Sequence, residues 1–334
     1  MAGSRPSRDP WAIPAVPLLA RSEHSRLAHR RTDESWLAQA WQRPDTRVLL
    51  LSQAGTVAVH GEDGSDLVLL APDRVETPGI RVLLGEAGGA AYFAVLADVA
   101  LSNGPSSNGV RPEGVPVAES WRSLREVGAQ LTDLDVGLLT SAVALQAWHY
   151  RHPRCPRCGA ATEVAQAGWS RVCPEDGSEH FPRTDPAVIM LVHDGAGRCV
   201  LARGPQWPVG RMSVLAGFVE AGESAESAVA REVGEEVGIQ VEQIRYQGSQ
   251  PHPFPASLML GFTARLAGDP TLRIDGDEIA EAGWFSRDEV RAAADWGTPE
   301  ADSAGGAAGA QLRGLPSTMS IARQLINSWL AGKD

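Results

Sequence analysis

Between residues 47 and 101 the chain alternates short apolar runs with Gly, Asp and Pro. Runs of this length bounded by turn residues are typical of β-strands, and short turns between them favour antiparallel pairing. The pattern therefore predicts a small antiparallel sheet. Its expected strands are Arg47–Leu51, Thr56–His60, Leu67–Ala71, Arg81–Gly85 and Ala91–Leu101.

A helical pattern follows a polar stretch. Ser102–Pro116 is rich in Gly, Pro, Ser and Asn, which predicts a surface loop or linker. Trp121–Arg125 and Thr132–His149 are predicted helices, and in the second the apolar residues recur at helical spacing. Residues 1–150 carry no motif that indicates a chemistry, so we expect a structural or dimer-forming domain there.

The C-terminal half mixes both periodicities. Alternating apolar runs, turn residues and amphipathic stretches predict a mixed sheet flanked by helices, an α/β sandwich. The expected strands are Pro186–His193, Arg198–Arg203, Ser213–Phe218, Glu242–Gly248, Leu258–Leu266 and Glu278–Phe285. The expected helices are Ser224–Val237, Asp288–Ala294 and Ser320–Ala331, and Asp295–Arg313 is an expected Gly/Ala-rich loop.

One of these helices, Ser224–Val237, carries an unusual set of charges. Glu232, Glu235 and Glu236 are spaced so that they converge on one side of the helix. Like charges so placed repel one another unless a cation lies among them. Oxygen donors on a rigid face suit a hard divalent ion such as Mg²⁺ or Mn²⁺. We therefore expect a metal site, and a solvated acidic helix face is the alternative.

Composition narrows the possible partners and the compartment. The chain has 334 residues, with 30 Lys and Arg against 41 Asp and Glu, a net charge of −11. This balance gives no general attraction for nucleic acid, so no DNA partner is expected. No apolar run is long enough to span a bilayer, and Pro14 and Pro17 interrupt the apolar N-terminal stretch, which disfavours a signal peptide. We predict a cytoplasmic protein.

A cluster of cysteines predicts a zinc ribbon. A Cys-x-x-Cys turn is followed about fifteen residues later by a third cysteine, which is the spacing of such ribbons. The candidate ligands are Cys155, Cys158, Cys173 and Asp176, with His180 as the alternative fourth ligand. A closed site of this kind is structural. Cys199 lies in a β-run and is expected to be an ordinary core thiol.

Taken together, these patterns predict four segments. Residues 1–20 form a flexible leader, 21–150 an N-terminal α+β domain with a helical linker, 151–184 the zinc ribbon and 185–334 the α/β domain.

Four stretches resemble a known family. From Gly217 to Ile239 the chain has Gly, five residues, Glu, seven residues and Arg-Glu-Val-x-Glu-Glu-x-Gly-Ile, which resembles the Nudix box. The zinc ribbon, the stretch Phe181–Pro186 and the segment Ser249–Pro255 resemble one Nudix branch, the NADH pyrophosphatases, also seen as removers of NAD caps from RNA. The chain departs from that branch at His252, where the family has Trp, and at Asp176, where it has a fourth zinc cysteine.

The resemblance implies a Nudix α/β/α sandwich and a homodimeric enzyme. It would hydrolyse the diphosphate of NAD or NADH, giving AMP and nicotinamide mononucleotide, from the free dinucleotide or from an RNA cap. The implied metal-binding positions are Glu232, Glu236, Glu278 and the backbone carbonyl of Ala216, for Mg²⁺ or Mn²⁺. The implied catalytic positions are Glu223, Arg231, Glu232, Glu235 and Glu236.

The resemblance also implies a substrate-binding set. Its members are Phe181, Phe218, Gln250, Pro251, His252, Pro253, Phe254, Pro255, Ala256, Ser257 and Ala322. Phe218 and Phe181 of the partner subunit correspond to aromatics that sandwich a base, although both rings could instead be core residues. Prolines at alternate positions fix φ and remove donors, which predicts an extended loop with few ladder hydrogen bonds.

Several roles stay open at this point. Glu235 is either a general base or a further metal ligand. Arg231 either pairs with Glu223 and pins the loop to the helix or binds a phosphate. A pyrophosphatase for ADP-ribose or another nucleoside diphosphate compound is the main alternative, favoured if His252 reshapes the base pocket. A non-catalytic nucleotide sensor is the other.

Overall fold

The computed structural model describes residues 16–60, 64–98, 120–274, 276–296, 298 and 312–332. The described chain divides into two compact units. The N-terminal unit comprises Leu18–Asp185 and the short segment Pro251–Leu258, and the C-terminal unit comprises Pro186–Gln250 and the chain from Met259 onward. Each unit is described by itself.

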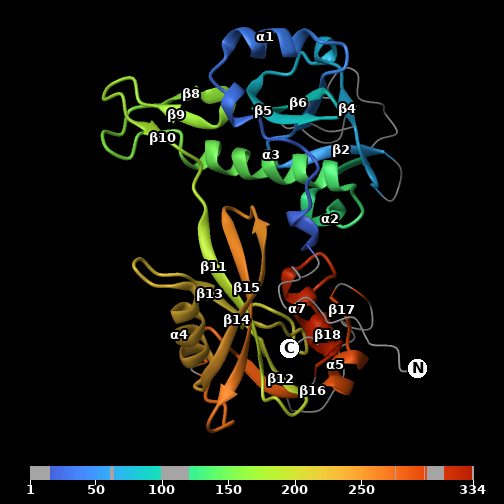
Figure 1. Ribbon diagram of the computed structural model, residues 1–334, viewed down its shortest axis with the longest axis vertical. Helices are drawn as coiled ribbons and strands as arrows, with labels where there is room; N and C mark the ends of the chain where they lie inside the picture. The colour runs from blue at the N-terminus through green and yellow to red at the C-terminus, as the bar shows by residue number, and fades with distance from the viewer. Residues whose placement is uncertain are drawn as a thin grey trace, which may run out of the picture. The chain divides into compact units, whose positions relative to one another are not determined.

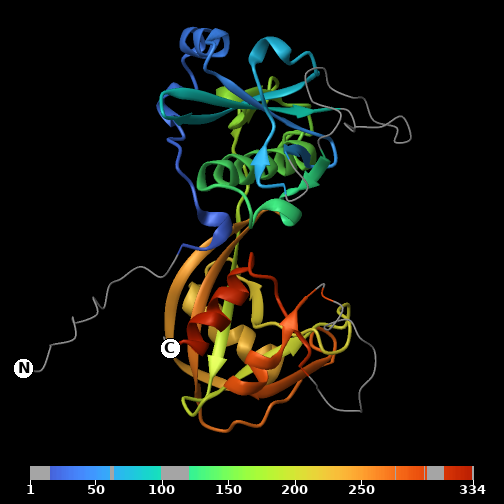
Figure 2. The ribbon, with the colours of Figure 1, turned by 90° about the vertical axis from the view of Figure 1, so that its right-hand side faces the viewer.

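The C-terminal unit is built on one six-stranded sheet in the order β14-β15-β11-β12-β16, with β13 paired to β11. Helix α4 covers one face of the sheet, and α5 and α7 cover the other (Figures 1 and 2). The strands of this part are β11 (Asp185–His193), β12 (Arg198–Arg203), β13 (Leu215–Phe218), β14 (Gln240–His252), β15 (Ser257–Ala267), β16 (Glu281–Ser286), β17 (Ala294–Asp295) and β18 (Gly314–Leu315). The helices are α4 (Ala225–Val237), α5 (Arg287–Ala292) and α7 (Ile321–Leu330).

Strand β11 shows why the sheet is buried on both faces. Val188, Met190 and Val192 pack into the core under α4, whereas Ile189 and Leu191 pack into the core under α7. A strand covered on both sides reads as a continuous apolar run rather than an alternating one. The predicted α/β sandwich and the β11–β12 hairpin are thereby confirmed.

Helix α4 begins and ends where its sequence signals stand. The Ser224 hydroxyl accepts a hydrogen bond from the Ser227 amide at 3.1 Å, a side-chain N-cap. Gly238 takes the left-handed conformation with φ of 68°, which stops the helix. Ala225, Val229, Val233 and Val237 recur every four residues and pack into the sheet core. Glu232 and Glu236 fall on the shoulder of this buried stripe.

Two expectations for the C-terminal half were wrong. Glu278 lies in a bend before β16 and not in the strand. Strand β16 pairs with β12, and this pairing begins at Glu281, which lies opposite Arg203, the last residue of β12. The proline segment is also not an extended loop. Strand β14 continues through Pro251 and His252, and residues 253–256 form the turn into β15. An edge strand tolerates a proline, because one of its backbone sides needs no ladder partner.

The N-terminal unit contains three small sheets and a long helix. The sheets have the strand orders β4-β1-β6-β5, β3-β2-β7 and β10-β9-β8. The strands are β1 (Arg47–Leu51), β2 (Thr56–His60), β3 (Asp66–Leu67), β4 (Leu69–Leu70), β5 (Gly79–Ala87), β6 (Ala90–Ala97), β7 (Ser120–Ser123), β8 (Glu163–Ala165), β9 (Ser170–Val172) and β10 (Glu179–His180). The helices are α1 (Glu34–Gln42), α2 (Leu124–Val127) and α3 (Asp133–Arg151), with 3-10 turns at Leu18–Ala20, Ala28–Arg30, Pro72–Arg74 and Gln166–Gly168.

The predicted antiparallel sheet and one predicted helix of this unit were wrong in part, since β5 and β6 do pair antiparallel and the helix begins only at Leu124. Strand β1 pairs with β6 in parallel, a partner more than forty residues away that local turn signals do not reveal. Trp121 and Arg122 lie in strand β7 rather than in a helix, since they pair with Ala58 and Val57 of β2. Pairing with distant strands overrides a local helical pattern. The predicted helix at Thr132–His149 is confirmed as α3.

Parts of three predicted segments lie outside the described residues. These are the start of the leader, residues 1–15, the linker Ser102–Pro116 and most of the loop Asp295–Arg313. Leu18–Ala20 forms a 3-10 turn with Leu19 buried, so these three residues belong to the fold rather than to a leader. Within the described chain, no helix is both long and apolar enough to cross a bilayer.

Candidate active site

Strand β13 brings its backbone into close contact with a carboxylate of α4. The contact is at Gly217, where a Cβ atom would overlap the carboxylate of Glu232. Only glycine leaves room for that side chain beside the strand. Glu232 is therefore held by α4 on one side and by the β13 backbone on the other.

Arg231 is the centre of the hydrogen-bond network. Its Nε and Nη2 atoms donate to the two carboxylate oxygens of Glu223, both at 2.9 Å, and Nη2 also donates to the Phe218 carbonyl at 2.9 Å. Nη1 donates to Glu232 and to Glu235, each at 2.9 Å. The expected contact between Arg231 and Glu223 is present. The contacts with Glu232 and Glu235 were missed, although a spacing of four residues on a helix signals the second.

The three box glutamates occupy different environments. Glu232 and Glu236 are buried, at 8% and 6% exposure, whereas the Glu235 side chain is 60% exposed. Burial raises the pKa of Glu232, the charges of Glu235 and Glu278 add to this rise, and Arg231 opposes it. Glu278 therefore lies within electrostatic reach of Glu232 although it is 46 residues away in sequence.

The pair Arg231–Glu223 stabilises the charged form of both side chains. The Arg231 guanidinium holds the pKa of Glu223 below its usual range, with help from the Glu220 amide. The Glu223 carboxylate in turn raises the pKa of Arg231. The loop and the helix start are thus joined by a permanently charged pair.

The donor set fits a hard divalent cation. Glu232 and Glu236 are buried one turn apart on α4, the charge of Glu278 acts on Glu232, and the Glu232 carboxylate lies against the backbone at Gly217. The Arg231 guanidinium pairs with Glu232 and with Glu235. Carboxylate and carbonyl oxygens are the ligands that Mg²⁺ and Mn²⁺ prefer.

Three expected substrate-binding residues lie in the same unit. Phe218 is 59% exposed, so its ring is not a core residue. Gln250 is buried; its amide donates to the Met319 carbonyl at 3.2 Å, and its buried Oε1 accepts no hydrogen bond within the described part of the chain. Ala322 is buried in the core under α7, and its amide is bonded to the Ser320 cap.

The other expected substrate-binding residues lie in the N-terminal unit. Phe181 is 59% exposed there, so it too is not a core residue. In the hairpin tip Pro251–Leu258, the rings of His252 and Phe254 meet edge-on at 5.0 Å, and the Arg125 guanidinium lies 3.8 Å from the Phe254 ring. Burial, then the Arg125 charge, lowers the pKa of His252. Sequence reasoning missed Arg125, because nothing local to α2 signals this contact.

The tip also borders a hollow of about 230 Å³ in the N-terminal unit. It is lined by Ala147, Trp148, Arg151, His152, Arg183, Asp185, Pro255 and Ala256. Pro255 and Ala256 are thus placed beside three basic side chains.

The cysteine cluster has the geometry of a metal site. Ligand atoms of Cys155, Cys158, Cys173 and Asp176 all lie within 4.8 Å of one another, and two sulfur atoms, Cys158 Sγ and Cys173 Sγ, are 3.5 Å apart. His180 is not in this group; its Nε2 contacts the Ser178 hydroxyl at 3.0 Å. The structure therefore favours Asp176 over His180 as the fourth ligand.

The surroundings of the cluster prepare two of the four ligands for a cation. Burial opposes ionisation of the Cys155 thiol, but hydrogen bonds from Ser178 and from backbone amides outweigh it and lower its pKa to about 6. Ser178 also lowers the pKa of Asp176 to about 2. Thiolate and carboxylate are the forms that bind zinc. Cys199, by contrast, is a buried thiol whose pKa burial raises to about 12, as expected for a core residue.

Comparisons with known proteins decide the family. A model of the NUDIX domain matches residues 183–303, and a model of the NADH pyrophosphatase zinc ribbon domain matches residues 151–181. The NAD-capped RNA hydrolase NudC of Mycobacterium bovis (strain BCG / Pasteur 1173P2) is 43% identical over 326 residues, which cover 96% of this chain and 97% of that protein. The chain is a Nudix hydrolase.

Two further proteins are similar to this Nudix hydrolase. The mitochondrial NAD(P)H pyrophosphatase NUDT13 of Mus musculus is 40% identical over 245 residues, 72% of this chain and 68% of that protein. A crystal structure of a NUDIX hydrolase from Nitrosomonas europaea is 24% identical with a TM-score of 0.35, covering 41% of this chain and 78% of that chain. The zinc-ribbon match assigns this Nudix hydrolase to the branch that its sequence resembles.

Proposed function

We propose that this Nudix hydrolase cleaves the diphosphate bond of NAD or NADH, giving AMP and nicotinamide mononucleotide, and that it also removes NAD caps from RNA. The observation that carries the proposal is the 43% identity, over almost the whole chain, to a protein named NAD-capped RNA hydrolase. The segment Ser249–Pro255, which departs from the signature of that branch at a single residue, supports the same substrate.

We assign the catalytic cation, Mg²⁺ or Mn²⁺, to Glu232, Glu236, Glu278 and the carbonyl of Ala216. A divalent ion held there neutralises diphosphate charge and lowers the pKa of a bound water. The burial of Glu232 and Glu236 and the close approach at Gly217 support this set.

The chain's own side chains have distinct tasks in this proposal. Arg231 positions Glu232 and holds the loop through Glu223 and the Phe218 carbonyl. Glu235, exposed and hydrogen-bonded to Arg231, is the proposed general base, because it can reach solvent that the buried glutamates cannot. The exposed ring of Phe218 stacks on a base, a contact worth about 1–3 kcal/mol.

The remaining substrate positions form two groups. Phe181 of the partner subunit is the proposed second aromatic in the base sandwich, which requires a homodimer. The hairpin tip from Gln250 to Ser257, stiffened by Pro251, Pro253 and Pro255, forms the proposed binding wall, and stiffness reduces the entropy lost on binding. Zinc at the cysteine cluster is structural, and the working compartment is the cytoplasm.

A second candidate is hydrolysis of ADP-ribose. The observation that favours it is His252, which stands where the branch has Trp and packs edge-on against Phe254. A smaller ring at this position leaves more room beside the tip, and this would relax selection for the nicotinamide half.

The test is product analysis with full-length protein and added Mg²⁺ or Mn²⁺ on NADH, NAD, ADP-ribose and NAD-capped RNA. We expect AMP and the mononucleotide from the dinucleotides. Glu236→Gln should lower kcat roughly 100-fold or more, because a metal ligand is lost. Glu226→Gln is the matched control, since Glu226 is exposed in the first turn of the same helix. Brisk turnover of ADP-ribose alone would reject the NAD proposal in favour of the second candidate.

A further inference from the structure

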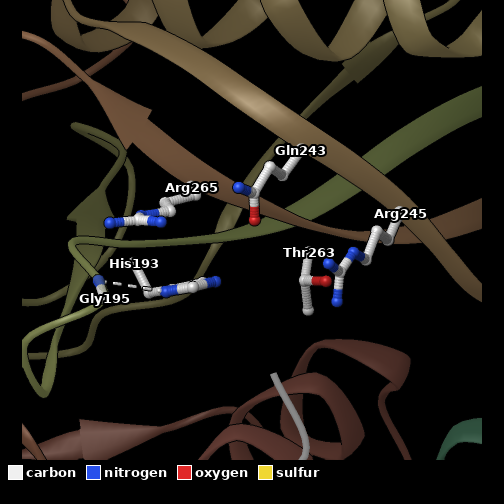
Figure 3. Close-up of a pocket in the computed structure, with 6 residues that line it drawn as sticks. All are labelled: His193, Gly195, Gln243, Arg245, Thr263 and Arg265. Atoms are coloured by element: carbon white, nitrogen blue, oxygen red, sulfur yellow. Dashed lines mark hydrogen bonds between the residues drawn. The ribbon is translucent and has the colours of Figure 1, made fainter.

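A second polar hollow lies on the sheet of the C-terminal unit. It has a volume of about 250 Å³ and is lined by His193, Gly195, Gln243, Arg245, Thr263 and Arg265 (Figure 3). These residues come from the β11–β12 hairpin and from the middle of β14 and β15. We call this hollow the basic pocket.

The basic pocket opens on the sheet face opposite the glutamates. On β11, His193 points to the same face of the sheet as Ile189 and Leu191, which pack on the α7 side. Val188, Met190 and Val192 point to the other face and pack under α4. On β15, Thr263 and Arg265 alternate with Phe262 and Ala264, which also pack on the α4 side.

The pocket is also distant from the glutamates along the strand. Val188 pairs with Gly217, the glycine beside Glu232. His193 is five residues further, or roughly 17 Å at about 3.3 Å per residue. The pocket therefore cannot hold the diphosphate that the glutamates would act on.

The permanently charged side chains that line the basic pocket are two arginines, Arg245 and Arg265. Within the described part of the chain, neither Arg245 nor Arg265 lies at ion-pair distance from a carboxylate. The nearby Asp194 is engaged with Arg198 at 2.8 Å. Figure 3 shows the Arg265 guanidinium at the end of the pocket beside Gly195 and the Arg245 guanidinium at the other end, beside Thr263. Two positive groups thus line one hollow on a protein of net charge −11.

The hydrogen bonds of two lining residues are defined. The Nδ1 atom of His193 accepts from the Gly195 amide at 3.2 Å. The Thr263 hydroxyl accepts from the Gln247 amide at 3.1 Å, so its own proton is available to an acceptor. In Figure 3 the Thr263 oxygen points toward Arg245.

One arginine is held in place by the hairpin. Gly195 has φ of 72°, and a Cβ atom there would lie 3.1 Å from Arg265 Nε and 3.4 Å from its Cζ. The guanidinium therefore lies against the bare backbone of the turn. Packing of this kind reduces the entropy that a long side chain loses when it binds a ligand.

We propose that the basic pocket binds one phosphate group and forms a site separate from the catalytic glutamates. A guanidinium group matches the oxygens of phosphate through two parallel hydrogen bonds, and the basic pocket is lined by two of them. The volume is below the 300–1,000 Å³ usual for whole organic ligands, which fits a single phosphoryl group with its water. The phosphate belongs to an RNA backbone or to a free phosphate compound, and the experiment separates these sources.

The test measures binding to full-length protein without added divalent ions, so no turnover is needed and the outcome does not depend on the proposed reaction. Three probes are compared: inorganic phosphate, AMP, and a short single-stranded RNA with a 5′ hydroxyl. The variant is Arg245→Gln/Arg265→Gln. The matched control is Arg273→Gln/Arg291→Gln, which removes the same charge from exposed arginines outside the pocket.

We expect the pocket variant to weaken binding of at least one probe tenfold or more, and the control to bind like the parent. Loss for phosphate and AMP alone identifies a free phosphate compound as the ligand. Loss for RNA, with a salt dependence whose slope falls by about 0.7, identifies one backbone phosphate. The single variants Arg245→Gln and Arg265→Gln are measured as well, and each should show part of the loss. Equal binding by parent, pocket variant and control, or no binding of any probe to the parent, overturns the proposal.

Discussion

At the residue scale, the position of Glu232 depends on Gly217, which has no side chain. The Gly217 backbone and the Glu232 carboxylate share one space, and Arg231 then fixes the carboxylate from the solvent side. The φ of Gly217 is not among the positive values, so the constraint on this position is the close approach of the carboxylate rather than a left-handed turn.

Replacing Gly217 with Ala is therefore expected to displace Glu232 rather than to strain the backbone. We predict a 10- to 100-fold loss in kcat/KM, equivalent to about 1.4–2.8 kcal/mol, with a smaller effect on KM. Gly234→Ala is the control, since a Cβ atom there meets nothing within 4 Å. That variant should keep full activity and gain about 0.5–1 kcal/mol of helix stability. Steady-state kinetics on NADH decide the matter; equal activity of both variants would contradict the role of Gly217.

At the element scale, α3 and the zinc ribbon are joined by a buried histidine. The Nε2 atom of His149 donates to the Gly168 carbonyl at 2.9 Å, and Nδ1 accepts from Arg171 of β9 at 3.0 Å. Arg171 in turn donates to the Thr162 hydroxyl at 2.7 Å. Burial, followed by the Arg171 charge, lowers the pKa of His149 to about 4 while the Gly168 bond opposes the shift. The ring is thus neutral at pH 7.

This arrangement predicts a pH-dependent contribution to stability. His149 has an ordinary pKa of 6.5 in the unfolded chain and about 4 in the folded one, so the unfolded state binds more protons between these values. The free energy of unfolding therefore falls as the pH drops below 6.5, by about 2 kcal/mol at pH 5 from this group. His149→Gln keeps the two hydrogen bonds and lacks the titration. Urea unfolding of both proteins at pH 7.5 and pH 5 should show that the free energy of unfolding of the parent falls, relative to that of His149→Gln, at the lower pH. A difference that is the same at both pH values would contradict the prediction.

At the scale of the whole molecule, two units carry different parts of the proposed function. The glutamates, Phe218 and Gln250 belong to the C-terminal unit, whereas Phe181, the hairpin tip and the cysteine cluster belong to the N-terminal unit. A single strand, β14, carries the chain from Gln250 into the tip. The cysteine cluster therefore lies in the same unit as Phe181 and the hairpin tip, which are proposed to bind substrate.

Loss of the ribbon metal should consequently lower stability more than intrinsic chemistry. Cys155→Ser removes a ligand whose lowered pKa favours the thiolate, and we expect loss of bound zinc and a melting temperature lower by several degrees. Asp176→Cys is the matched comparison. It supplies a fourth thiolate and should retain zinc against a chelator better than the parent. Zinc content by mass spectrometry and thermal melting measure both effects. Unchanged melting of Cys155→Ser would argue against a structural metal.

The sequence was sufficient where neighbours along the chain set the structure. The continuous apolar run of β11, the cap at Ser224, the stop at Gly238 and the spacing of the cysteines each act within a few residues. These local signals determine the α/β sandwich, the box helix and the ribbon. They also bring Glu232 and Glu236 together, because a helix places residues four apart on one face.

Tertiary structure alone decided what depends on distant segments. The parallel pairing of β1 with β6, the strand at Trp121, the contact of Arg125 with Phe254 and the basic pocket all join residues far apart in the chain. Such contacts are selected by packing and burial across the whole unit, which no short window of sequence contains. For the same reason, the three box glutamates look equivalent in the sequence, and only the fold buries two and leaves Glu235 in solvent.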